Sequence, residues 1–268
     1  MGLILYKEKI ANYLNHDQKT EELGFDNTRL SYIPEYFSSY VEQERIPNFV
    51  CLVSRFGEVA HYSHQGFKNI ESKEKIDNET IFRIYSMTKP ITSVAIMMLY
   101  ERGLIRLEHE LYRYLPEFKN TEVWVTGDIN NFKTKPLNNP ILIRDLLTHT
   151  AGFTYDFMLG HPAIGLYRKN GLHDYKNIET QEEMDLEEFC NKLSRLPLLF
   201  DPGEKWHYSC SIDILGRVVE VVSGMKLDAF FRENIFNPLE MFDTGFNVEK
   251  DKLDRFSDCY QTMLGSKK

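Results

Sequence analysis

The sequence lacks several features that would assign it to a specialised class of protein. Its 268 residues include only 4 cysteines, which are far apart and form no CxxC pair. A disulfide framework or a thiolate metal site is therefore not expected. The 8 histidines are scattered as well, and we predict neither a metal site nor an organic cofactor. The sequence has no internal repeat and no low-complexity segment, so the absences together favour an ordinary globular protein.

Long apolar runs and an excess of basic residues are also missing. No run approaches the ~18–20 residues that a membrane-spanning helix needs. The apolar patch Leu3–Tyr6 is short and is followed at once by Lys7 and Glu8, unlike a secretory signal. The net charge of −8 gives no reason to expect binding to nucleic acid or to an anionic membrane. We therefore expect a cytoplasmic protein that binds neither.

The apolar residues that are present predict several helices and one hairpin. Helical spacing over about 27–44 predicts an amphipathic helix, and two β-rich runs around Phe56-Gly57-Glu58 predict an antiparallel hairpin. The run 81–85 predicts a short strand that leads into a buried helix over 91–99. Further helices are predicted over 141–147, 186–196, 211–224 and 227–235, whereas 104–118 and 123–140 are expected to be irregular.

The predicted passage from the run 81–85 into the buried helix contains a possible nucleophile. Three serines have a lysine three positions later: Ser72 with Lys75, Ser86 with Lys89, and Ser223 with Lys226. The pattern is weak by itself, since roughly one is expected by chance in a chain of this length. Ser72 lies in a charged loop, and Ser223 lies at a helix end. Only Ser86 lies where a predicted strand passes into a buried helix.

That position has chemical consequences for Ser86 and Lys89. Residues three apart lie on the same face of a helix. The unpaired N–H groups and the partial positive charge of the helix N-terminus surround the serine oxygen. The same field and burial disfavour a charged lysine, which can then accept a proton from the serine. The alternative is that Ser86 is only a helix cap and Lys89 a solvated side chain.

Four blocks of sequence favour the catalytic interpretation. In order, FRIYSMTKPITSVAIMMLYERG, ILIRDLLTHTAGF, LPLLFDPGEKWHYSCSIDILGRVVEVVSG and IFNPLEMFDTGF resemble blocks of the serine β-lactamase-like hydrolases, especially the class-C-related carboxylesterases. The resemblance implies that Ser86 is the acylated serine, Lys89 its proton partner and Tyr208 the general base or proton shuttle. His149 with Asp145 suggests a Ser-His-Asp triad instead, but no G-x-S-x-G elbow exists, and the block implies a scaffold role for His149.

Three departures from the family pattern affect what we expect. The family's Tyr-x-Asn is Tyr208-Ser209-Cys210 here, so a substrate-binding amide is replaced by a thiol, a poor hydrogen-bonding group. Cys210 is the one candidate substrate-binding residue, and its thiol favours an esterase over a β-lactamase. Glu240 stands where the family usually has glycine. Nothing after Gly245 resembles the family's last strand motif, which completes the oxyanion hole.

These observations predict a fold and a function. We expect an α/β (α+β) fold of the β-lactamase/transpeptidase type, with an antiparallel sheet flanked by helices and C-terminal strands missing. Residues 1–268 would form one C-terminally incomplete domain, with a helical lobe over about 104–205, and the incomplete sheet would favour association. The predicted function is hydrolysis of a small ester or amide through acyl-Ser86. The alternatives are a penicillin-binding D-Ala-D-Ala peptidase or β-lactamase, and a truncated non-catalytic relative acting as a binding module.

Overall fold

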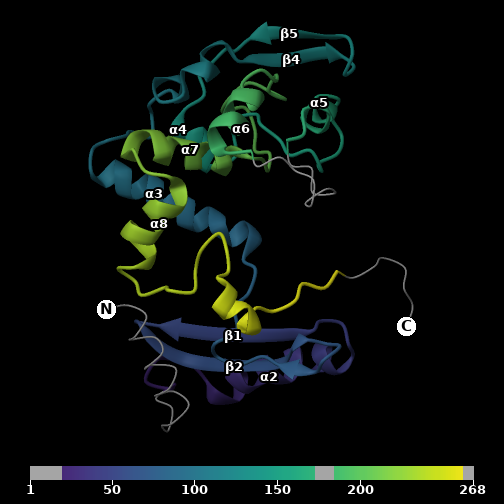
Figure 1. Cartoon of the computed structure of the whole chain (residues 1–268), viewed down its shortest axis with the longest axis vertical. Helices are drawn as coiled ribbons and strands as arrows, with labels where there is room; N and C mark the ends of the chain where they lie inside the picture. The colour runs from purple at the N-terminus through teal and green to yellow at the C-terminus, as the bar shows by residue number, and fades with distance from the viewer. Residues whose placement is uncertain (1–19, 173–183, 262–268) are drawn as a thin grey trace. The chain divides into compact units, whose positions relative to one another are not determined.

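The computed structural model describes residues 20–172 and 184–261. The chain divides into two compact units, the first made of Met1–Tyr85 with Phe236–Lys268 and the second of Ser86–Ile235 (Figure 1). The apolar patch Leu3–Tyr6 lies outside the described residues. Among the helices that are described, none is long and apolar enough to cross a membrane.

The first unit is built on a small antiparallel sheet with a helix on one face. Helix α2 (Asn27–Glu42) is followed by strands β1 (Asn48–Arg55), β2 (Glu58–Asn69) and β3 (Glu74–Lys75), in the sheet order β1-β2-β3 (Figure 1). The Phe37 ring of α2 stacks on Phe49 of β1, with 5.2 Å between ring centroids. The predicted amphipathic helix and hairpin are therefore confirmed.

The strand predicted over 81–85 is wrong. Only Ile81 makes a bridge, parallel to Phe256, and the Ser257 N–H donates to the Ile81 carbonyl over 2.9 Å. The chain then turns into the short 3₁₀ helix η1 (Tyr85–Met87), with Tyr85 at φ +40°. A non-glycine residue in this left-handed region cannot continue a strand. The β-rich run therefore forms one bridge, at Ile81, and the chain changes direction at Tyr85.

The second unit is mainly helical. Its helices are α3 (Thr88–Glu101), α4 (Ile143–Leu147), α5 (Ile164–Lys169), α6 (Leu186–Leu193), α7 (Ser211–Ser223) and α8 (Leu227–Phe231), with the short 3₁₀ helices η2 (Leu111–Arg113) and η3 (Pro116–Asn120). Helix α7 is central, because it packs against α3, α4, α6 and α8. Gly216 permits this packing, since a Cβ there would lie 2.9 Å from the Leu227 side chain. The residues of the predicted lobe, about 104–205, fall within the range of this unit, and the lobe itself stays a prediction.

A hairpin occupies a stretch that the sequence predicted to be irregular. Strands β4 (Glu122–Gly127) and β5 (Phe132–Pro136) pair antiparallel. The Trp124 and Phe132 rings stack across the pair at 4.8 Å. The turn is closed by the Asp128 carboxylate, which accepts the N–H groups of the two asparagines that follow. Exposed polar residues in both strands hide the alternation that would have predicted them.

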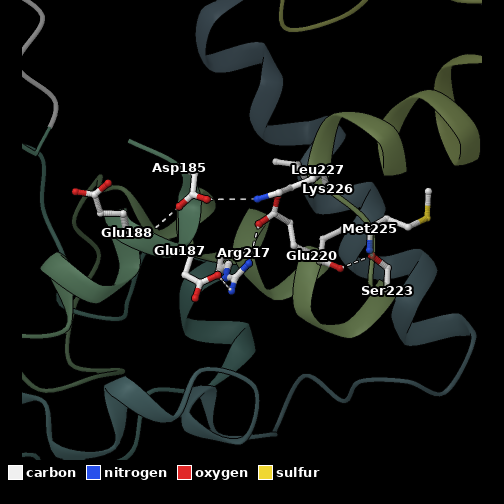
Figure 2. Close-up of polar contacts among 10 residues, drawn as sticks. Asp185, Glu187, Glu188, Arg217, Glu220, Ser223, Met225, Lys226 and Leu227 are labelled. Carbon is white, nitrogen blue, oxygen red and sulfur yellow. Dashed lines mark hydrogen bonds and ion pairs between the residues drawn. The ribbon is translucent and has the colours of Figure 1, made fainter. Parts of the chain in front are cut away.

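The first turns of α6 and α8 are tied to α7 by charged side chains (Figure 2). Arg217 of α7 contacts Glu187 at 2.5 Å and Glu220 at 3.1 Å. The Glu220 carboxylate is 8% exposed and also accepts the N–H of Leu227, at the start of α8, over 3.1 Å. Buried carboxylates need such partners, so this cluster fixes how the three helices meet.

Candidate active site

Ser86 lies in η1, immediately before the first turn of α3. The cap position of α3 is Met87, and no side chain there bonds the helix N-terminus. The Ser86 hydroxyl is therefore not used as a helix cap, and the residue is exposed. Its position at the end of a 14-residue helix exposes it to the positive end of the peptide dipoles.

The structure separates Ser86 from the other two serines that precede a lysine by three. Lys89 Nζ donates to Ser86 Oγ over 3.2 Å, as one helical turn of spacing predicts. The Ser223 hydroxyl instead donates to the Val219 carbonyl of its own helix over 2.6 Å. Ser72 lies in a turn, where its N–H donates to the Asn69 side chain. Of the three serines, all of which lie in the described part of the chain, only Ser86 is hydrogen-bonded to the lysine three positions later.

Tyr208 completes the group, although it lies 122 residues further along the chain. Its Oη shares a hydrogen bond of 2.8 Å with Ser86 Oγ, and Lys89 Nζ lies 4.8 Å from the centre of its ring. Burial acts to raise the pKa of Tyr208, but the Lys89 ammonium and the Ser86 hydroxyl outweigh it, so the pKa is lowered. A phenol with a lowered pKa spends more time as phenolate, the form that accepts a proton.

Two residues near this group were not identified from the sequence. Tyr155 places its ring 5.6 Å from Lys89 Nζ and 5.3 Å from the Tyr208 ring. Asp213, in the first turn of α7, has its pKa raised to about 6 because burial disfavours the carboxylate, while Lys89 opposes the shift. An aspartate in a first helical turn is usually explained by the helix dipole, so the sequence carried no signal of a role near Lys89.

Cys210, the candidate substrate-binding residue, has a buried side chain. Its side chain is fully buried at the start of α7, and burial raises the pKa of its thiol well above the ordinary value. Its backbone N–H donates to the Thr154 carbonyl over 3.4 Å. A side chain with no exposed surface cannot touch a substrate, so burial removes the physical basis of the predicted contact.

His149 and Asp145 do not form a triad with Ser86. The Asp145 carboxylate accepts the Leu142 N–H over 3.0 Å and is 3.5 Å from the Thr150 hydroxyl. His149 Nδ1 is 3.2 Å from the Ser209 hydroxyl. Within residues 20–172 and 184–261, no group of three or more His, Cys, Asp or Glu side chains is arranged to hold a metal ion.

A serine hydrogen-bonded to both a lysine and a tyrosine, just before a helix, is the arrangement typical of the β-lactamase-like class of serine enzymes. The chain belongs to the Beta-lactamase family, whose sequence profile matches residues 33–266. The fold is accordingly of the β-lactamase/transpeptidase type, as the four blocks of sequence predicted.

Several relatives carry names that describe ester or acyl chemistry. The chain is 34% identical to Esterase EstB of Burkholderia gladioli over 210 residues, 78% of this chain and 50% of that protein. It is 32% identical to Monacolin J acid methylbutanoyltransferase of Aspergillus terreus, over 83% of this chain and 53% of that protein. Among solved structures, EstCE1, a hydrolase with promiscuous acyltransferase activity, matches 91% of this chain and 58% of its own, with a TM-score of 0.73 and 29% identity. The chain thus spans about half the length of the curated relatives it matches.

Proposed function

We propose that this chain carries the acylation chemistry of a serine hydrolase that cleaves a small ester or amide through acyl-Ser86. The observation that carries the proposal is the position of Ser86 Oγ, which is 2.8 Å from Tyr208 Oη and 3.2 Å from Lys89 Nζ. A serine hydroxyl is a weak nucleophile until a neighbouring base removes its proton. Here one candidate proton acceptor, Tyr208 Oη, and one amine that donates, Lys89 Nζ, lie within hydrogen-bonding distance of the same oxygen.

The proposed reaction has two halves. In the first, the Tyr208 phenolate, which Lys89 stabilises, takes the hydroxyl proton of Ser86 and becomes a neutral phenol while Ser86 Oγ attacks the carbonyl carbon. The carbon–oxygen bond to the leaving group then breaks, and the proton passes to the departing alkoxide. In the second, water attacks acyl-Ser86 and the same groups handle its proton. The Ser86 N–H supplies one oxyanion donor, a kind of contact typically worth about 10²–10³ in rate.

An ester substrate fits the site better than a β-lactam. The position that holds an amide in β-lactamases is here the fully buried Cys210, which offers no donor to a β-lactam side chain. The relatives are named for esterase and methylbutanoyl transfer chemistry, which favours a small-molecule ester. Those names also favour a second candidate function, in which an alcohol replaces water as acceptor of the acyl group. A cytoplasmic location and association through the sheet stay predictions.

The direct test is to identify the acylated residue. The protein is treated with a fluorophosphonate probe, digested and analysed by mass spectrometry, beside Ser86→Ala and a matched Ser223→Ala control. We expect one adduct, on Ser86, which is lost in Ser86→Ala and kept in Ser223→Ala. An adduct on Ser72 or Ser223 with Ser86 unmodified would refute the assignment, and a protein without any adduct would favour the non-catalytic alternative.

A further inference from the structure

One residue outside the proposed chemistry contacts three consecutive residues around Tyr208. The His149 carbonyl accepts the His207 N–H over 2.8 Å. The His149 ring packs on the Tyr208 ring, with 5.0 Å between centroids and 50° between planes. Its Nδ1 is 3.2 Å from the Ser209 hydroxyl. The backbone before the tyrosine, the tyrosine ring and the side chain after it are thus each held by a different group of one residue.

The backbone of His149 and the hydrogen-bond partner of its imidazole are both held in place. Its backbone has φ +56°, a conformation uncommon for a residue other than glycine. The Ser209 hydroxyl that meets Nδ1 is buried and shares a 2.8 Å hydrogen bond with buried Ser211, the first residue of α7. Through Ser209 and Ser211 the imidazole is thus connected to α7, which packs against four other helices.

We propose that His149 is a positioning residue that acts through Tyr208 by holding its phenol oxygen at hydrogen-bonding distance from Ser86. The inference rests on the proposed function of Ser86 and Tyr208. A displacement of about 1 Å in a reacting group can cost about 10² in rate. A residue that fixes the backbone, ring and following side chain of the base therefore determines the acylation rate without touching the substrate.

The charge state of His149 suits this role. Burial lowers its pKa, and the nearby Lys89 and His207 lower it further. The imidazole is therefore neutral at neutral pH and adds no positive charge beside Lys89. It packs on the phenol ring with 5.0 Å between ring centroids, within the range of an aromatic pair.

A double-mutant cycle separates positioning from general stability. The rate constant for labelling of Ser86 by a fluorophosphonate is measured in wild type, His149→Ala, Tyr208→Phe and the double variant. We expect His149→Ala to lower the rate by about 10–10²-fold when Tyr208 is present, and to change it little in the Tyr208→Phe background, because the group it positions is gone. An equal loss in both backgrounds would overturn the proposal.

The chain offers a matched control in His161. It is also half-buried in the second unit, its Nδ1 accepts the Ala163 N–H over 3.1 Å, and its ring lies 5.7 Å from the Trp124 ring. His161→Ala should lose stability but label at the wild-type rate. His149→Asn, which tolerates the left-handed backbone and keeps a polar atom near Nδ1, should recover part of the rate. Loss of rate in His161→Ala equal to that in His149→Ala would contradict the inference.

A second measurement does not depend on labelling. In protein made with tyrosine enriched in ¹³C at Cζ, the NMR signal of Tyr208 is identified by its loss in Tyr208→Phe. This signal should shift in His149→Ala. If that variant does not fold, Ser209→Ala serves instead, because it is a small change at a buried position that removes the partner of His149 Nδ1, and the signal should shift there too. If the Tyr208 signal does not move in these variants, the positioning role of His149 is wrong, even if the wild-type protein is labelled normally at Ser86. A wild type that does not label at Ser86 instead refutes the proposed function.

Discussion

Removing the guanidinium of Arg217 should destabilise the protein strongly, because it leaves the buried carboxylate of Glu220 without its cation. Breaking a buried ion pair from one side typically costs about 3–5 kcal/mol. Arg217 is 17% exposed, and Glu220 keeps the hydrogen bond from the Leu227 N–H. We therefore expect Arg217→Met to lower the free energy of unfolding by about 2–4 kcal/mol, measured by urea unfolding at pH 7 followed by circular dichroism.

Two further variants test the reasoning behind that value. Arg217→Met with Glu220→Leu leaves no buried charge, so the double variant should be more stable than Arg217→Met alone. Glu187→Gln removes the other carboxylate bound by Arg217, but Glu187 is 58% exposed, and the loss should be about 0–1 kcal/mol. The argument fails if the double variant is less stable than Arg217→Met, because a buried unpaired charge would then not be the cause.

Three more predictions concern the site. Lys89→Ala and Tyr208→Phe should each lower the rate of Ser86 acylation by about 10²–10⁴-fold with little change in urea midpoint, and a near-normal rate in Tyr208→Phe would refute its role. Short-chain p-nitrophenyl esters should react much faster than nitrocefin, and a higher kcat/KM for nitrocefin would favour a β-lactamase. Because burial raises the pKa of Asp213 to about 6, its protonated form stabilises the folded state fully below the unfolded pKa of about 3.9, and this stability is lost as the pH rises through about 6. Asp213→Asn should flatten the fall in unfolding free energy over that range in a urea series, whereas an unchanged slope contradicts the assignment.

The helix that follows Ser86 could be predicted from the sequence because its signal is local, although the strand predicted before Ser86 is wrong. A buried helix can be identified from neighbouring apolar residues, and a residue three positions later must then lie on the same face. Tyr208 has no local signal, since its contact with Ser86 crosses 122 residues. Only the resemblance to a family identified it. The burial of Cys210 was missed for the same reason, because what covers a side chain depends on distant segments.

The elements that the sequence missed depend on tertiary contacts. Strand β4 is held partly by Leu198, whose carbonyl accepts the Trp124 N–H over 2.9 Å and which is far away in the chain. Lys133 and Lys135 of β5 are typical of solvated edge strands, which lack apolar alternation. The run 81–85 shows the reverse case. Its β-rich residues predicted a strand, but the left-handed backbone of Tyr85 ends the pairing after Ile81.

The division of the chain has a consequence for synthesis on the ribosome. The second unit is one continuous stretch, Ser86–Ile235, inserted between the two segments of the first. Domains generally fold as units while the chain emerges from its N-terminal end. Ser86, Lys89 and Tyr208 are therefore all available to meet before Phe256, which pairs with Ile81, has been translated. These three residues therefore belong to a continuous stretch of chain, whose folding need not wait for Phe236–Lys268 to be translated.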